Sequence, residues 1–148
     1  MKISSIRKLE KITNKIKKII SPGDSIFLYG EIGVGKTTFV RFLINSYEKE
    51  NKIKKSEVLS PTFNIVFEYK IKKFKIQHFD LYRLKNFRDI KNIGLFENSE
   101  NILTIIEWPE LMKKKPINRI DLFFKYEKDY TERSVDIKLN GRLKLHEI

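Results

Sequence analysis

The sequence contains the run Gly30-Glu31-Ile32-Gly33-Val34-Gly35-Lys36-Thr37. This run matches the phosphate-binding loop pattern, in which two glycines enclose four residues and are followed by lysine and then serine or threonine. Glycine lets the backbone approach a ligand closely, so that successive N–H groups turn toward phosphate oxygens. The lysine of such a loop reaches the β- and γ-phosphates, and the next hydroxyl binds Mg²⁺. The run therefore predicts a site for a nucleoside triphosphate, with Lys36 on the phosphates and Thr37 on Mg²⁺.

The residues on either side of this loop fit a strand and a helix. Ser25–Tyr29 is a short, mostly apolar run, as a buried parallel strand requires. After the loop, apolar side chains recur at helical spacing from Phe39 to Tyr47. Phosphates held by the loop would therefore lie at a helix N-terminus, where the macrodipole favours anions. We expect the nucleotide contacts to run from Gly30 to Thr38.

The remaining apolar patterns alternate between helices and strands. A stripe over 3–19 has helical spacing, with Ser4 or Ser5 as its N-cap, and Ser21–Asp24 ends that helix. The later patterns predict an antiparallel hairpin at 65–69 and 74–79, a helix at 87–93, a buried strand at 102–106 and a closing strand pair at 119–126 and 133–139. This order predicts one α/β domain over 1–148, a three-layer P-loop NTPase-like fold with a mixed parallel and antiparallel sheet flanked by helices.

Composition limits the class and the location of the protein. The 148 residues include no cysteine, which excludes a disulfide framework and a thiolate metal site. Lysines interrupt every apolar run near the N-terminus, so we expect no signal peptide, no membrane contact and a cytoplasmic location. The 31 basic and 19 acidic residues give a formal charge of +12. This charge fits either a nucleic-acid or acidic partner, or a genome biased toward lysine codons.

Two later motifs carry polar side chains that fit the same site. In Ser60-Pro61-Thr62-Phe63 the proline constrains the loop, and Thr62 either senses the γ-phosphate or belongs to an ordinary turn. In His78-Phe79-Asp80-Leu81-Tyr82-Arg83, Asp80 follows an apolar strand and reaches the sheet edge where nucleotides bind. Asp80 either orients the attacking water or caps the next helix. For His78, the alternative to a role in the site is a partly buried histidine whose hydrogen bonds are satisfied within the fold.

A third motif, Glu107-Trp108-Pro109-Glu110, follows the strongest of the later strands. An acid at the end of an apolar strand occupies the Walker B position, where its carboxylate reaches Mg²⁺ directly or through water. The alternative for Glu107 is an ordinary surface carboxylate. Trp108, the only tryptophan, either borders the nucleotide site or packs in the core.

In this order along the chain, the four motifs resemble those of the bacterial TsaE (YjeE) family, over about residues 3–139. The resemblance implies a weak Mg²⁺-dependent ATPase needed to form N6-threonylcarbamoyladenosine at position 37 of tRNAs that read ANN codons. It also implies partners, a complex of TsaB and TsaD in which TsaD is the transferase, and only indirect or weak contact with tRNA.

The resemblance further implies roles for single residues. Lys36 would hold the phosphates of ATP, Thr37 and Glu107 would be ligands of Mg²⁺, and Asp80 would serve hydrolysis. Thr62 matches a switch-like motif, so Lys36, Thr62 and Asp80 form the predicted catalytic set. The predicted nucleotide-binding set is Gly30, Glu31, Ile32, Gly33, Val34, Gly35, Lys36, Thr37, Thr38 and Trp108.

Two other classes of protein share part of this pattern. A small nucleoside or nucleotide kinase also uses a phosphate-binding loop, but it needs a second substrate pocket and usually a lid with arginines. The arginines of this chain are scattered, and no arginine-rich lid is evident. A nucleotide-regulated RNA-binding module would explain the charge but not Asp80 and Glu107, and its RNA affinity would fall steeply as salt rises.

Overall fold

The computed structural model of the chain describes residues 1–143, which form one seven-stranded sheet with helices on its faces. The strands are β1 (Lys2–Ile3), β2 (Ser25–Tyr29), β3 (Val66–Ile71), β4 (Phe74–Asp80), β5 (Ile102–Glu107), β6 (Arg119–Glu127) and β7 (Glu132–Asn140). The helices are α1 (Ile6–Ile19), α2 (Lys36–Glu50) and α3 (Phe87–Lys91), with 3-10 turns η1 (Ser99–Asn101) and η2 (Pro109–Leu111).

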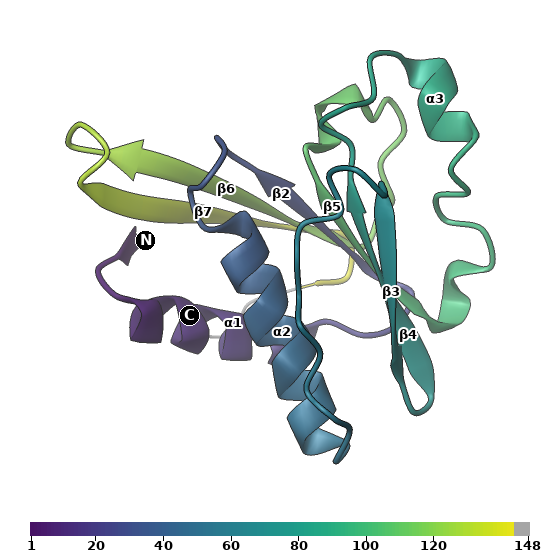
Figure 1. Cartoon of the computed structure of the whole chain (residues 1–148), viewed down its shortest axis with the longest axis horizontal. Helices are drawn as coiled ribbons and strands as arrows, with labels where there is room; N and C mark the ends of the chain where they lie inside the picture. The colour runs from purple at the N-terminus through teal and green to yellow at the C-terminus, as the bar shows by residue number, and fades with distance from the viewer. Residues whose placement is uncertain (144–148) are drawn as a thin grey trace.

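The sheet has a parallel centre and antiparallel edges (Figure 1). Its strand order is β1-β7-β6-β2-β5-β4-β3. Strand β2 pairs in parallel with both β5 and β6, and β4 pairs in parallel with β5. At one side of the sheet β3 pairs antiparallel with β4. At the other side β7 pairs antiparallel with β6, and β1 pairs antiparallel with β7. The predicted mixed sheet is confirmed.

Helices α1 and α2 cover one face of the sheet, and α3 with η2 lies over the other (Figure 1). The alternation of side chains in β2 produces this division, because successive residues of a strand point to opposite faces. Ile26 and Leu28 pack in the core under α1 and α2, whereas Phe27 packs with Ile90 of α3. The predicted three layers are confirmed, although only short elements cover the second face. None of the described helices is long and apolar enough to cross a membrane.

Two elements differ from the sequence-based prediction at their ends. The first helix begins at Ile6, which agrees with the predicted cap at Ser4 or Ser5, but Ile3 of the predicted helical stripe lies in β1 and pairs with Arg133. Ser5 is the N-cap, with extended backbone and a side-chain oxygen that accepts from the Lys8 N–H at 3.2 Å. Ile6, which we expected on the buried stripe, is exposed. The helix predicted over 87–93 ends at Lys91.

The parallel strands deliver three segments to one edge of the sheet. In their register Leu28 pairs with Glu107, and Glu107 pairs with Asp80. The phosphate-binding loop follows β2 directly, so both carboxylates lie beside it. This is the carboxyl edge of the parallel strands, where ligands bind in open α/β sheets.

Candidate functional site

The phosphate-binding loop packs against the hydrophobic core on the side that faces away from the pocket. Gly30, Gly33 and Gly35 all have positive φ angles, of 141°, 78° and 121°. A Cβ on Gly30 would lie 2.8 Å from the Phe124 carbonyl oxygen and 2.9 Å from Val34 Cγ1. The Val34 side chain is itself buried in the core under the helices. Gly30 and Val34 therefore hold the loop against the sheet, and Gly33 and Gly35 face the pocket.

We expect Gly30→Ala to lower the free energy of unfolding by about 1–3 kcal/mol more than Gly35→Ala does. Both substitutions place a side chain at a positive φ angle, which costs energy in either position. Only at Gly30 does the new Cβ also meet backbone and core atoms, since at Gly35 nothing lies within 4 Å. Urea denaturation of the two variants measures the difference, and equal losses would contradict this packing role.

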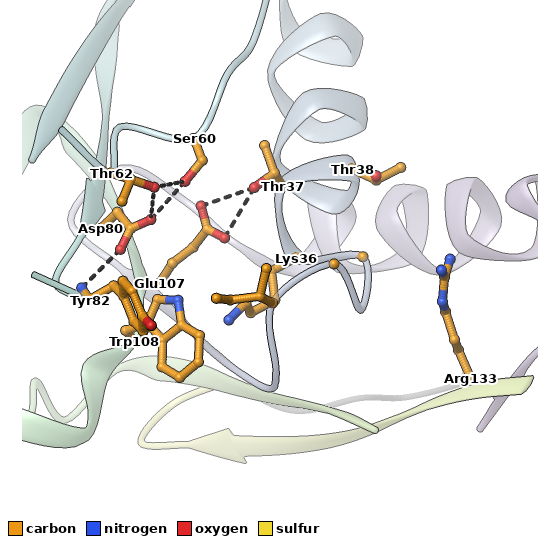
Figure 2. A pocket seen from close by; sticks show the side chains of 13 residues that line it. Lys36, Thr37, Thr38, Ser60, Thr62, Asp80, Tyr82, Glu107, Trp108 and Arg133 are labelled. Carbon is orange, nitrogen blue, oxygen red and sulfur yellow. Dashed lines mark hydrogen bonds between the residues drawn. The ribbon is translucent and has the colours of Figure 1, made fainter. Parts of the chain in front are cut away.

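A pocket of about 280 Å³ lies between this loop, the ends of β4 and β5, and the loop at 60–62 (Figure 2). It contains most of the residues predicted for nucleotide and metal binding. Gly30, Glu31 and Val34 belong to the predicted set but do not line it. The lining residues are Ile32, Gly33, Gly35, Lys36, Thr37, Thr38, Ser60, Thr62, Asp80, Tyr82, Glu107, Trp108 and Arg133.

The Lys36 side chain is buried and has no carboxylate within ion-pair distance among the described residues. It donates a hydrogen bond to the Gly30 carbonyl oxygen and lies 3.7 Å from the centroid of the Trp108 ring. Burial lowers the pKa of Lys36 from its usual value, and the nearby charges of Glu107, Asp80 and Glu110 oppose that shift. An anion entering the pocket would therefore meet a poorly solvated cation, the condition in which a phosphate contact is strong.

Glu107 lies at the end of β5 and faces the first turn of α2. Its carboxylate accepts a hydrogen bond from the Thr37 hydroxyl, with Oγ1 at 3.2 and 3.3 Å from the two oxygens. Only 2% of Glu107 is exposed, so the surface-carboxylate alternative is wrong. His78 of β4 also contacts this carboxylate, with Nε2 at 2.6 Å from Oε2. The expectation that His78 is partly buried and satisfied is wrong, because His78 is fully buried and its Nδ1 has no partner among the described residues.

Asp80 holds the loop at 60–62 in place (Figure 2). Its Oδ2 accepts hydrogen bonds from the Ser60 hydroxyl at 2.7 Å and from the Thr62 hydroxyl at 3.0 Å. Its Oδ1 accepts from the Tyr82 N–H at 2.9 Å. The helix-capping alternative is wrong, because Asn86 caps the next helix. Thr62 and Asp80 are thus part of one hydrogen-bonded group on the wall of the pocket.

Three lining residues were absent from the predicted site. The Ser60 hydroxyl had a sequence signal, because it stands next to the proline of a motif already singled out. The Tyr82 ring lies against Trp108, with ring centroids 4.8 Å apart. Arg133 reaches the pocket from β7 because the β6–β7 hairpin pairs it with Tyr126 of β6. No local sequence pattern predicts this pairing register. For Trp108 the sequence left two alternatives, the border of the nucleotide site and the core. The side chain is half-buried and lines the pocket.

A second hollow of about 430 Å³ adjoins the first. The two share Gly35, Thr38 and Arg133 as lining residues. The far wall of the second hollow comes from the start of α1 and the β6–β7 turn, including the exposed side chains Ile6 and Tyr130. Both hollows therefore border the N-terminus of α2, and Glu107 lines only the first.

Most of the chain is similar to proteins of one known family. The family model described as threonylcarbamoyl adenosine biosynthesis protein TsaE matches residues 3–135. The protein named tRNA threonylcarbamoyladenosine biosynthesis protein TsaE of Rickettsia conorii is 36% identical over 75% of this chain and 61% of its own length. The protein of the same name from Aquifex aeolicus is 38% identical over 74% of each chain. This chain thus covers about three fifths of the Rickettsia relative's length.

A solved structure supports the fold. The crystal structure of Bacillus subtilis YdiB aligns with a TM-score of 0.68 over 95% of this chain and 84% of that chain, at 22% sequence identity. At that identity the likeness concerns the fold alone. The family model spans most of the sequence and contains all four motifs around the pocket. From this match, and from the relatives of the same name, the chain belongs to the TsaE family.

Proposed function

We propose that this chain binds Mg·ATP and hydrolyses it slowly, in support of N6-threonylcarbamoyladenosine formation at position 37 of tRNA. The observation that carries the proposal is the contact of Thr37 with Glu107 next to the buried Lys36 ammonium. A lysine for phosphates with a hydroxyl and an acid for Mg²⁺ is the arrangement that P-loop NTPases use. The names of the relatives support the tRNA-modifying role. We expect a cytoplasmic location because tRNA is the target.

Thr37 and Glu107 are the residues we propose for holding Mg²⁺. Both offer hard oxygen donors, and Mg²⁺ in nucleotide sites takes one or two protein ligands plus phosphate oxygens and water. The described residues contain no group of three acidic or histidine side chains that would bind a metal by themselves. A site completed by the nucleotide fits this pair. When bound, Mg²⁺ neutralises charge that develops on the β- and γ-phosphates.

Asp80 and Thr62 are the residues we propose for the hydrolysis step. Asp80 accepts hydrogen bonds from Ser60, Thr62 and the Tyr82 N–H, so it fixes the Thr62 hydroxyl on the pocket wall. From that place the Thr62 hydroxyl would contact the γ-phosphate by turning its hydrogen from Asp80 to a phosphate oxygen, as residues of switch loops do. The Asp80 carboxylate retains lone pairs that would orient the attacking water.

The adjoining hollow is the place we propose for the ribose and adenine. Thr38 and Arg133 line both hollows, so they would contact the nucleotide between its phosphates and its base. The exposed Ile6 and Tyr130 side chains offer apolar surface for a base. Trp108 stays at the phosphate end, next to Lys36.

A complex of TsaB and TsaD is the partner we propose, docked over the mouth of the nucleotide pocket. Exposed large apolar side chains occur at this pocket: Ile32 and Tyr82 line it, and Leu59 and Phe63 are the chain neighbours of the lining residues Ser60 and Thr62. Exposed apolar groups gathered in one place are typical of protein interaction sites. A partner there would sense whether the pocket holds nucleotide. The lysines are dispersed, so we expect contact with tRNA to be weak or indirect.

Following the γ-phosphate of labelled ATP tests this function. We expect phosphate to be released to water slowly by the chain alone and faster with its matching TsaB and TsaD. The Lys36→Ala variant is the inactive control. Nucleosides and nucleoside monophosphates are offered in parallel, because a kinase would transfer the label to one of them. Of the described arginines only Arg133 lines the pocket, which disfavours a kinase. Label on a nucleoside or nucleotide would overturn the proposal.

A further inference from the structure

His78 makes one short hydrogen bond in a site closed to solvent. It lies in β4, two residues before Asp80, and its side chain is fully buried. Its Nε2 lies 2.6 Å from Oε2 of Glu107, whose side chain is only 3% exposed. Because a carboxylate only accepts hydrogen bonds, Nε2 must carry the hydrogen. The contact is a charge-assisted hydrogen bond from the ring to the proposed metal ligand.

The other ring nitrogen of His78 shows that packing alone does not explain the residue. Nδ1 is buried and has no hydrogen-bond partner among the described residues. A buried polar atom without a partner costs stability, and an apolar side chain of similar size would avoid that cost. The chain nevertheless places histidine here, in contact with the acid of the site. The contact with Glu107 is therefore the feature that accounts for His78.

This contact makes the two oxygens of Glu107 different. Oε2 is held at 2.6 Å by a ring fixed in a central strand, and the Thr37 hydroxyl is farther from it, at 3.3 Å. Oε1 contacts Thr37 at 3.2 Å and receives nothing from His78. The Thr37 hydroxyl lies almost equally far from both oxygens, so the His78 contact is what distinguishes them: it holds Oε2 and leaves Oε1 available for the metal that Thr37 is proposed to share.

We propose that His78 is a positioning residue that orients Glu107 for Mg²⁺ binding. The inference rests on the proposed function, because it concerns the metal of the nucleotide site. Partners that orient a metal ligand typically change metal affinity by about 10- to 100-fold when they are removed. His78 acts through Glu107 and lines neither of the two hollows proposed for the nucleotide.

The test measures how binding of a non-hydrolysable ATP analogue depends on Mg²⁺, using the fluorescence of Trp108, the only tryptophan. His78→Leu removes the N–H donor and keeps an apolar side chain, whereas the amide nitrogen of His78→Gln can reach the place of Nε2. We expect the half-saturating Mg²⁺ concentration to rise about 10- to 100-fold in His78→Leu. In His78→Gln it should return most of the way to the wild-type value.

Three controls separate positioning from loss of structure. Analogue affinity in EDTA should be the same in all variants, because Lys36 and the loop remain intact. His78→Met gives a second variant without a donor if His78→Leu does not fold. In a Glu107→Ala background, His78→Leu should have no further effect on the Mg²⁺ dependence.

The outcomes distinguish this inference from the proposed function. Mg²⁺ dependence equal to wild type in folded His78→Leu or His78→Met would overturn the positioning role and leave the nucleotide site standing. Loss of affinity in EDTA to the same degree as in Mg²⁺ would also overturn it, since that pattern indicates a structural role. Wild-type protein whose nucleotide binding ignores Mg²⁺ would overturn the proposed function and this inference with it.

Discussion

Lys36→Ala is expected to weaken Mg·ATP binding by about 10- to 150-fold, which corresponds to the loss of roughly 1.5–3 kcal/mol for a hydrogen bond to a charged group. Among the described residues, the buried Lys36 ammonium donates to the Gly30 carbonyl oxygen and lies over the Trp108 ring, and a phosphate would be a stronger partner than either. Titration calorimetry measures the change in affinity.

Lys49→Ala is the matched control for this prediction. Lys49 is a lysine of the same helix, but it lies in the last turn of α2 and is exposed. Its removal changes the net charge equally and should leave the affinity for Mg·ATP within about twofold, since an exposed and distant charge is screened. Equal losses in both variants would indicate a general charge effect, and unchanged affinity in Lys36→Ala would refute the phosphate role of the loop.

Asp80→Asn is expected to lower ATP turnover by about 10²- to 10⁴-fold, the range for a group that acts on a proton in the transition state. Affinity for Mg·ATP should stay close to wild type, because an interaction made only in the transition state changes kcat without changing binding. Single-turnover hydrolysis and equilibrium binding on the same preparation separate the two quantities.

Asp136→Asn is the control for Asp80→Asn, because Asp136 is an exposed carboxylate that contacts Lys125 outside the pocket. It should change neither turnover nor affinity. A fall in affinity that matches the fall in turnover in Asp80→Asn would mean that Asp80 is a structural or metal residue. The roles proposed for Asp80 and Glu107 would then be exchanged.

Much of the fold could be predicted because its signals are local. The phosphate-binding loop is one continuous run, and the buried strand β5 is short and apolar except for Thr104 and the final Glu107. Strand β1 could not be predicted, because two residues are too few to show alternation. The pattern predicted the cap at Ser4 or Ser5, but it placed Ile3 on the helix, whereas Ile3 lies in β1, and it expected Ile6 to be buried, whereas Ile6 is exposed.

The positions of site residues could be predicted where each residue lies at the end of a strand that is recognisable in the sequence. Glu107 and Asp80 follow apolar strands, and parallel strands end at one edge of a sheet. The hydrogen bonds of these carboxylates could not be predicted, because their donors lie on segments that are distant in the sequence. Ser60 and Thr62 reach Asp80 only after their loop folds over β4, and Arg133 reaches the pocket only through the register of the β6–β7 hairpin.

The two outer strands of the sheet affect how copies of this chain behave in concentrated solution. An exposed strand edge offers unpaired N–H and C=O groups that can pair with another molecule and begin aggregation. On one side the outermost strand is β1, whose two residues pair with only Arg133 and Ser134 of β7, and on the other it is β3, where Glu68 and Lys70 are exposed. Short edges and charged edge residues both discourage such pairing. Some of the abundant lysine therefore has a use that involves no ligand, which is to keep these molecules apart.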